Sequence, residues 1–173
     1  MRKLTLLIIL VATAAVALPQ QMQMPKASGP QSDAQKAFEK MKTLAGTWEG
    51  TYMGMSGKVT IRVTSTGNAI LHEMTASGRP DDPITMIYVD RDRLLLTHFC
   101  DSGNRPRMQG KLSPDGNTVT FAFLDVVGNT DEFLMHDITF TMVDADHHIE
   151  AFTYSLNGKP SIRAPGMQLQ RTK

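Results

Sequence analysis

The chain has 173 residues, enough for one domain of ordinary size and too few for two well-packed ones. Its 18 lysines and arginines nearly balance its 17 aspartates and glutamates, so it lacks the basic charge typical of proteins that bind nucleic acid. Hydrophobic residues make up 41% of the chain and charged residues 20%, which indicates a folded core and excludes a disordered chain.

The N-terminus has the pattern of a secretory signal. Arg2 and Lys3 precede an apolar run over 4–16, which ends in small residues that a signal peptidase accepts. The run is shorter than the ~20 residues that cross a bilayer, so we expect residues 1–17 to be removed and no transmembrane span to remain. The protein is therefore predicted to be exported, to the periplasm or outside the cell. An uncleaved signal anchor is the alternative.

The segment that follows leads into a short helix. Residues 18–31 are rich in proline and glutamine and show no hydrophobic periodicity, so we expect a flexible tether. A helix is then predicted to begin at Ser32, which forms a capping box with Gln35. Ala34 and Phe38 begin an apolar stripe at helical spacing. A stripe this narrow needs a surface to pack on, so we expect the helix to cover the end of a larger core.

Beyond Gly46 the hydrophobic pattern has a period of two. It predicts about ten short strands, over 47–53, 58–64, 68–76, 84–89, 94–100, 107–112, 118–124, 134–143, 148–156 and a last run that ends near Arg171. Turn residues separate the runs and no crossover helix intervenes, which predicts consecutive antiparallel hairpins. Because closure removes exposed edges, we expect residues 32–173 to form an all-β domain. The predicted architecture is an antiparallel up-and-down barrel of about ten strands with a short N-terminal helix, rather than a sandwich.

The start of the first strand resembles a known superfamily. Gly46-Thr47-Trp48, directly after a short helix, resembles the Gly-x-Trp signature of the calycins, which include lipocalins and fatty-acid-binding proteins. The longer stretch 44–50 is most similar to the start of nitrobindin-type barrels. The resemblance implies that an arginine of the last strand covers Trp48, and Arg171 is the candidate. Guanidinium over an indole ring gives a cation–π attraction, which supports this pairing.

A second block, THFC followed by GNRPRM within residues 97–108, resembles an exported bacterial family of unknown function. This block is more specific than the Gly-x-Trp signature, but it names no activity.

Strand alternation predicts which side chains face the barrel interior. The clearest case is His136, which alternates with Ile138 and Phe140 along one predicted strand. The predicted ligand-binding residues of the lumen are His72, Tyr88, His98, Cys100, His136 and Phe140. Since a barrel of ten strands is wide enough to leave space inside, we expect a binding protein that holds a small apolar or amphipathic ligand. The alternative is a structural or interaction protein with a dry core, in which the histidines are hydrogen-bonded internally.

Arg105 and Arg107 follow a turn and flank a proline, so they are candidates for binding a carboxylate or phosphate head group at the barrel mouth. The alternative is that both are solvated surface residues.

Cofactor binding is a further alternative. Haem needs one axial imidazole in an apolar cavity, which His136 or a histidine of the ninth strand would supply. Zinc or copper would need His98, Cys100 and His136 to meet across the lumen, because the sequence has no short metal-binding spacing.

Signatures of common enzyme classes are absent from the sequence. It contains no Gly-x-Ser-x-Gly elbow, phosphate loop or dinucleotide fingerprint, so we do not expect an enzyme. His98 and Cys100 lie side by side on one predicted strand face, which leaves a thiolate dyad as an alternative. Cys100 is the only cysteine and makes no disulfide within the chain, so either burial or chemistry accounts for it.

Overall fold

The computed structural model describes residues 30–128, 133–156 and 159–172. The predicted signal, 1–17, and nearly all of the predicted tether, 18–31, lie outside the described residues. Within the described part of the chain, no helix combines the length and hydropathy needed to cross a membrane.

The described residues form eleven β-strands. They are β1 (Gly46–Tyr52), β2 (Met55–Thr64), β3 (Ala69–Ala76), β4 (Ile84–Asp90), β5 (Arg93–Phe99), β6 (Arg105–Leu112), β7 (Thr118–Val127), β8 (Leu134–Met142), β9 (His147–Leu156), β10 (Lys159–Arg163) and β11 (Met167–Arg171). From β1 to β9 each strand pairs antiparallel with its successor, as expected when short turns join strands of alternating hydrophobicity.

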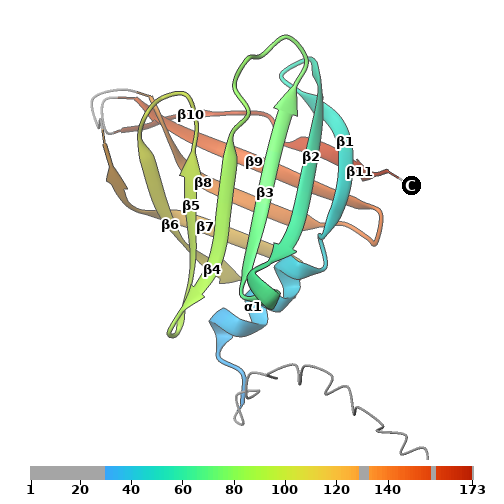
Figure 1. Ribbon diagram of the computed structural model, residues 1–173, viewed down its shortest axis with the longest axis vertical. Helices are drawn as coiled ribbons and strands as arrows, with labels where there is room; N and C mark the ends of the chain where they lie inside the picture. Colours follow the sequence, from blue (N-terminus) through green and yellow to red (C-terminus); the bar gives the residue numbers. More distant parts are fainter. Residues whose placement is uncertain (1–29, 129–132, 157–158, 173) are drawn as a thin grey trace, which may run out of the picture.

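The sheet closes on itself through β11, which pairs with β9 on one side and with β1 on the other (Figure 1). Strands β10 and β11 lie along successive parts of β9: β11 along residues 147–150 and β10 along residues 153–156. They therefore share one position, and the sheet is a closed, ten-stranded antiparallel barrel. This confirms the predicted fold class, although the last predicted strand is divided at residues 164–166.

Helix α1 (Asp33–Lys42) covers one end of the barrel, where it packs on β4, β5 and β6 (Figure 1). Its first turn has the predicted capping box. Ser32 Oγ accepts a hydrogen bond from the Gln35 N–H at 3.2 Å, and Gln35 Oε1 accepts one from the Ser32 N–H at 3.0 Å. The apolar face of the helix, including Ala37 and Met41, is buried against the barrel. The short helix is therefore held by packing as well as by its cap.

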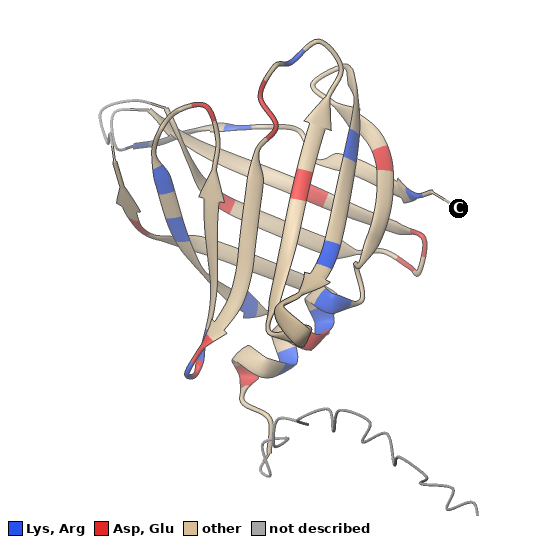
Figure 2. Ribbon diagram, in the orientation of Figure 1, with Lys and Arg blue, Asp and Glu red and all other residues tan. Residues whose placement is uncertain are grey.

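The interior is filled unevenly along the barrel axis. Near α1 it is packed with fully buried apolar side chains such as Trp48, Leu96 and Phe121. The other end of the barrel encloses a cavity, described below. Charged residues of both signs are interspersed over strands and turns in the view of Figure 2.

One irregularity changes which side chains face inward. The pairing of β8 with β9 shifts between Met135 and Asp137, which is a bulge near the start of β8. A bulge places one extra residue on its strand, so the alternation before it is offset from the alternation after it.

Candidate functional site

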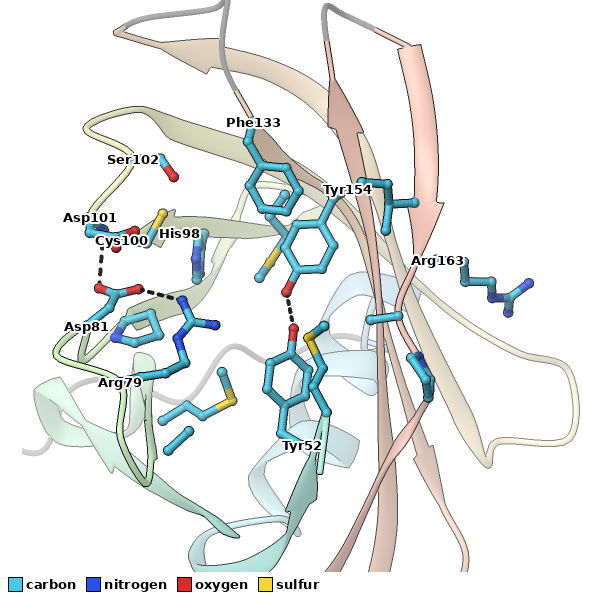
Figure 3. Close-up of a pocket in the computed structure, with 18 residues that line it drawn as sticks. Tyr52, Arg79, Asp81, His98, Cys100, Asp101, Ser102, Phe133, Tyr154 and Arg163 are labelled. Carbon is cyan, nitrogen blue, oxygen red and sulfur yellow. Dashed lines mark hydrogen bonds and ion pairs between the residues drawn. The ribbon is translucent and has the colours of Figure 1, made fainter. Parts of the chain in front are cut away.

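The cavity has a volume of about 430 Å³ and lies at the barrel end opposite α1 (Figure 3). Its walls come from the ends of β1, β3, β5 and β9, the start of β8, and β10 with the segment after it. The lining residues are Tyr52, Met53, Met74, Ala76, Arg79, Asp81, Pro83, His98, Cys100, Asp101, Ser102, Phe133, Met135, Tyr154, Ile162, Arg163, Ala164 and Pro165. Most of this surface is apolar, and a few polar groups converge on it, as in small-molecule sites.

His98 is the histidine of the cavity wall. Its Nδ1 lies 2.9 Å from the hydroxyl oxygen of Thr85, which occupies the paired position on β4. Burial lowers the pKa of His98 to about 4, and the positive charge of nearby His72 adds to this effect. The ring is therefore neutral at physiological pH, and Nε2 has no hydrogen-bond partner among the described residues.

Two tyrosines form a hydroxyl pair on the opposite wall. The Tyr52 and Tyr154 oxygens are 2.6 Å apart, so one hydroxyl donates to the other (Figure 3). Burial raises the pKa of Tyr154, and the hydrogen bond with Tyr52 raises it further. The Tyr154 hydroxyl therefore remains protonated at physiological pH.

Charged groups lie at the entrance. The Arg79 guanidinium is 3.7 Å from the Asp81 carboxylate, and that carboxylate also accepts the Asp101 N–H at 3.2 Å (Figure 3). Burial and the neighbouring Asp101 charge raise the pKa of Asp81. Arg163, also at the entrance, points away from the cavity in Figure 3.

Beneath the cavity lies a buried network of three ionisable side chains. The Glu150 carboxylate is fully buried and accepts hydrogen bonds from His72 Nε2 at 3.0 Å and from His148 Nε2 at 2.9 Å. Phe140 and Trp48 contact the two imidazoles edge-on, with ring centroids 5.9 Å from His72 and 4.2 Å from His148. The carboxylate is therefore surrounded by donors inside an apolar shell.

The charges of this network stabilise one another. Burial alone lowers the pKa of His72, but the charge and hydrogen bond of Glu150 outweigh it, so the pKa of His72 is raised. Burial likewise raises the pKa of Glu150, but the two histidines outweigh it and lower that pKa to about 2. His72 and Glu150 therefore form a buried ion pair, whereas His98 nearby is neutral.

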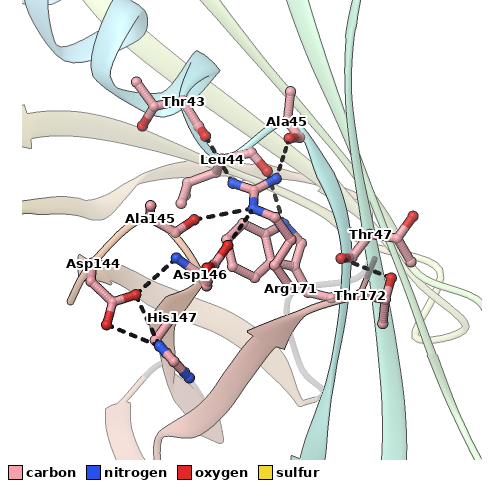
Figure 4. A network of polar contacts seen from close by, with 11 residues as sticks. Thr43, Leu44, Ala45, Thr47, Asp144, Ala145, Asp146, His147, Arg171 and Thr172 are labelled. Carbon is pink, nitrogen blue, oxygen red and sulfur yellow. Dashed lines mark hydrogen bonds and ion pairs between the residues drawn. The ribbon is translucent and has the colours of Figure 1, made fainter.

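The end under α1 is sealed by Arg171 over Trp48, the arrangement that the calycin resemblance implies. The guanidinium carbon lies 4.0 Å from the centre of the indole ring, and Arg171 also donates to the carbonyl oxygens of Ala45, Thr43 and Ala145 (Figure 4). A Cβ atom at Gly46 would collide with this guanidinium, so the position requires glycine.

The predicted lumen residues are distributed over three locations. His98 and Cys100 line the cavity, whereas His72 and Phe140 lie in the packed layer beneath it. His136 does not line the cavity. At the β8 bulge, Met135 takes a place in the cavity wall while the His136 ring stacks on Phe123, with ring centroids 4.8 Å apart.

Tyr88 was predicted to face the lumen, and the structure places it on the outside. The inner face of β4 is formed by Thr85 and Ile87, and the Tyr88 hydroxyl lies 3.5 Å from the Thr97 hydroxyl on the outer face of β5. The alternation of this strand was therefore assigned to the wrong faces, because both of its faces carry apolar residues.

Arg105 and Arg107 were predicted to lie at the mouth, and neither lines the cavity. Arg107 points outward from β6 and donates to Asp125 through Nε at 2.6 Å, while Arg105 is exposed. The cationic residues at the entrance are Arg79 and Arg163.

The sequence prediction missed the role of Glu150 and His148. His148 and Glu150 alternate with Phe152 along β9, so the pattern places all three on one face, but neither ionisable residue was among the predicted lumen residues. The sequence nevertheless contains a signal, because Glu150 lies on an apolar strand face together with a histidine. A carboxylate buried on such a face requires hydrogen-bond partners.

The metal set suggested by the sequence does not form. Among the described residues, no three histidine, cysteine, aspartate or glutamate side chains gather as metal ligands. His98 and Cys100 share the cavity, but His136 is separated from them by the β8 bulge.

Comparison with solved structures supports the fold. Rv2717c from M. tuberculosis matches with a TM-score of 0.61 and 15% identity, over 79% of this chain and 98% of that one. A protein of unknown function from the DUF3598 family of Nostoc punctiforme PCC 73102 matches with a TM-score of 0.55 and 12% identity, over 76% of this chain and 49% of that one. This chain therefore spans about half the length of the second protein.

No family model and no curated protein matches the chain. At these identities the structural matches show the fold alone. The closed ten-stranded barrel fits a calycin-like fold, and the resemblance of residues 97–108 to an exported family stays a prediction.

Proposed function

We propose that the protein is an exported binding protein that holds a small, mainly apolar or amphipathic molecule in the cavity at the open end of the barrel. The observation that carries the proposal is the cavity itself. Its volume of about 430 Å³ lies within the range of about 300–1,000 Å³ that is typical of small-molecule sites. A barrel that served only as a structural element would be more stable with this space filled by side chains.

The character of the wall supports this class of ligand. Met74, Met135 and Phe133 supply apolar surface, and methionine side chains adapt to ligands of different shapes. His98 and the Tyr52–Tyr154 pair add a few hydrogen-bonding groups that orient a ligand. Export to the periplasm or the exterior rests on the signal pattern of residues 1–17.

Haem is the second candidate, because His98 lines the cavity and is neutral. Iron binds a ring nitrogen through its lone pair, so binding at Nε2 needs the ring proton on Nδ1, donated to Thr85. The Thr85 hydroxyl proton would then lose its acceptor in a buried position. The fit to haem is therefore incomplete. A Soret band after stoichiometric haem addition, lost in His98→Phe, would reverse the order of the two candidates.

The binding proposal is tested with N-phenyl-1-naphthylamine, an uncharged apolar dye that fluoresces in apolar surroundings. We expect saturable binding to the wild type and none to Ala76→Trp, because the indole would occupy the cavity. Leu124→Trp, at an exposed position of β7, is the matched control and should bind as the wild type does. Equal binding by both variants, or none by the wild type, would overturn the proposal. Native mass spectrometry of protein purified from its own compartment then gives the mass of a co-purified ligand.

A further inference from the structure

Thr85 and His98 form a polar pair in which His98 lines the cavity and Thr85 is buried at the paired position of β4. Register places His72, Thr85 and His98 side by side on β3, β4 and β5, and the His72 ring is already engaged with Glu150. Thr85 is 3% exposed, and its hydroxyl has His98 Nδ1 as its hydrogen-bond partner within the described residues. The hydrogen bonds of the pair therefore determine the proton position on the His98 ring.

Two arrangements of protons are compatible with the 2.9 Å separation. If Nδ1 carried the ring proton and donated to Thr85, the buried hydroxyl proton would be left without an acceptor. If the Thr85 hydroxyl donates to Nδ1, the buried hydroxyl proton has its acceptor and the ring proton lies on Nε2 of His98, the member of the pair that lines the cavity. Because an unsatisfied buried donor is costly, the second arrangement is favoured. His98 then presents an N–H donor to the cavity.

The tyrosine pair contributes a second donor. Of the two hydroxyl protons of Tyr52 and Tyr154, one lies in the bond between the oxygens. The other has no acceptor among the described residues, although both side chains line the cavity. His98 and the tyrosine pair therefore each offer a hydrogen-bond donor to a ligand.

The charged side chains around the cavity balance one another, so no excess positive charge is available to bind an anion. The charged side chains of the described lining are Arg79, Arg163, Asp81 and Asp101, two of each sign. Arg79 faces Asp81, and Arg163 points away from the cavity in Figure 3. The low pKa of His98 keeps its ring uncharged as well. A buried carboxylate would lack a counter-charge, whereas a neutral acceptor would not need one.

We infer that the ligand of this cavity carries an uncharged hydrogen-bond acceptor of the carbonyl type, which accepts the His98 Nε2–H. Thr85 is the positioning residue that holds His98 in this tautomer. This inference rests on the proposed function, because it assigns the polar group of a ligand that the cavity must first bind.

The tautomer is measured without any ligand. In long-range ¹⁵N–¹H spectra of the selectively ¹⁵N-histidine-labelled protein, assigned with His98→Phe, we expect the Nε2–H pattern for His98 at pH 7. Thr85→Val removes the hydroxyl donor and should shift His98 toward a mixture of tautomers, whereas Thr85→Ser retains a hydroxyl and should restore the wild-type pattern. An Nδ1–H pattern in the wild type, or no change in Thr85→Val, overturns the inference.

The ligand class is tested with three naphthalene probes that differ only in their polar group. These are 2-acetylnaphthalene, 2-ethylnaphthalene and 2-naphthoate, with affinities from equilibrium fluorescence titration. For the wild type we expect the ketone to bind about tenfold more tightly than the hydrocarbon, as one hydrogen bond to a neutral group provides. We expect the carboxylate to bind at least about tenfold more weakly than the ketone, because its charge is not compensated.

Variants test whether the preference for the ketone over the hydrocarbon depends on the Thr85–His98 pair. In His98→Phe and Thr85→Val the preference for the ketone should fall to about threefold or less, while Met135→Leu, an apolar change in the same wall, should preserve it. Equal binding of ketone and hydrocarbon by the wild type, or tightest binding of the carboxylate, overturns this inference and leaves the binding function standing. Absence of binding by all three probes overturns the binding function together with it.

Discussion

At the end of the barrel under α1, the Arg171 guanidinium donates hydrogen bonds to carbonyl oxygens and packs on the indole ring of Trp48. The Trp48 side chain itself is fully buried. At the other end, His98 and the tyrosine pair keep donors that face an open cavity. The polar groups of Arg171 under the helix are engaged within the fold, whereas under the proposed function those around the cavity interact with a ligand. Under the proposed function, stability and binding therefore depend on opposite ends of the barrel.

The largest effect is expected at the boundary between the two ends, where Glu150 joins His72 and His148. Glu150→Gln removes the charge that compensates the His72 imidazolium, so the free energy of unfolding from urea denaturation should fall by about 3 kcal/mol. Glu49→Gln, on the exposed face of β1, is the matched control and should change it by less than about 0.5 kcal/mol. Similar losses in both variants would contradict a stabilising role for the buried network.

The second effect sharpens the contrast between the two histidines His98 and His72. The pKa of His98 is lowered from 6.5 to about 4 by burial, so the unfolded chain binds its proton first as the pH falls. This removes about 2 kcal/mol of stability between about pH 7 and about pH 5. His72, whose pKa is raised, has the opposite sign: its contribution is present below about pH 6.5 and is lost as the pH rises through its folded pKa.

The measurement is urea unfolding of the wild type and His98→Phe at both pH values. The variant should lose the His98 contribution and become less sensitive to acid than the wild type. An unchanged loss of stability between the two pH values would assign it to another group.

A smaller effect is expected at the sealed end. Arg171→Ala removes the cation–π contact and the bonds to carbonyl oxygens, and should cost about 1.5 kcal/mol by urea denaturation. Arg171→Lys keeps the charge but loses the planar fork, so it should recover only part of this loss. Arg163→Ala, at the cavity entrance, is expected to change stability by less than about 0.5 kcal/mol. A larger loss for Arg163 than for Arg171 would reverse the comparison of the two ends.

The smallest effect on stability is expected at the rim of the cavity. Ile162 is half-exposed on β10, so Ile162→Ser should change the free energy of unfolding by less than about 0.5 kcal/mol. It removes apolar lining, however, and should weaken dye binding about threefold. Leu124→Ser, at an exposed position of β7, should change neither quantity, and weaker binding in that control would argue against a local effect.

Much of the fold follows from the sequence because it depends on local patterns. Period-two hydrophobicity and turn residues predict consecutive hairpins, and Ser32 with Gln35 predicts the start of the helix. The division of the last strand at residues 164–166 was not predicted, because the sequence there has no regular alternation to interpret.

The site was predicted less well than the fold. His98 and Cys100 were placed in the lumen because Leu94 and Leu96 share their strand face, and the structure puts both in the cavity wall. His136 was displaced by a bulge, which depends on tertiary pairing and leaves no local signal in the sequence. Tyr88 failed for a different reason, since alternation gives the two faces of a strand but not which one is buried.

The division of the last strand into β10 and β11 has a mechanical consequence. β11 forms the seam of the cylinder with β1, while β10, joined to it through residues 164–166, borders the entrance and is paired with β9 alone among the described strands. Separation of β10 from β9 would therefore widen the entrance of the cavity, while the pairing of β11 with β1 stays intact. Under the proposed function, β10 would control access of the ligand, whereas β11 keeps the barrel closed.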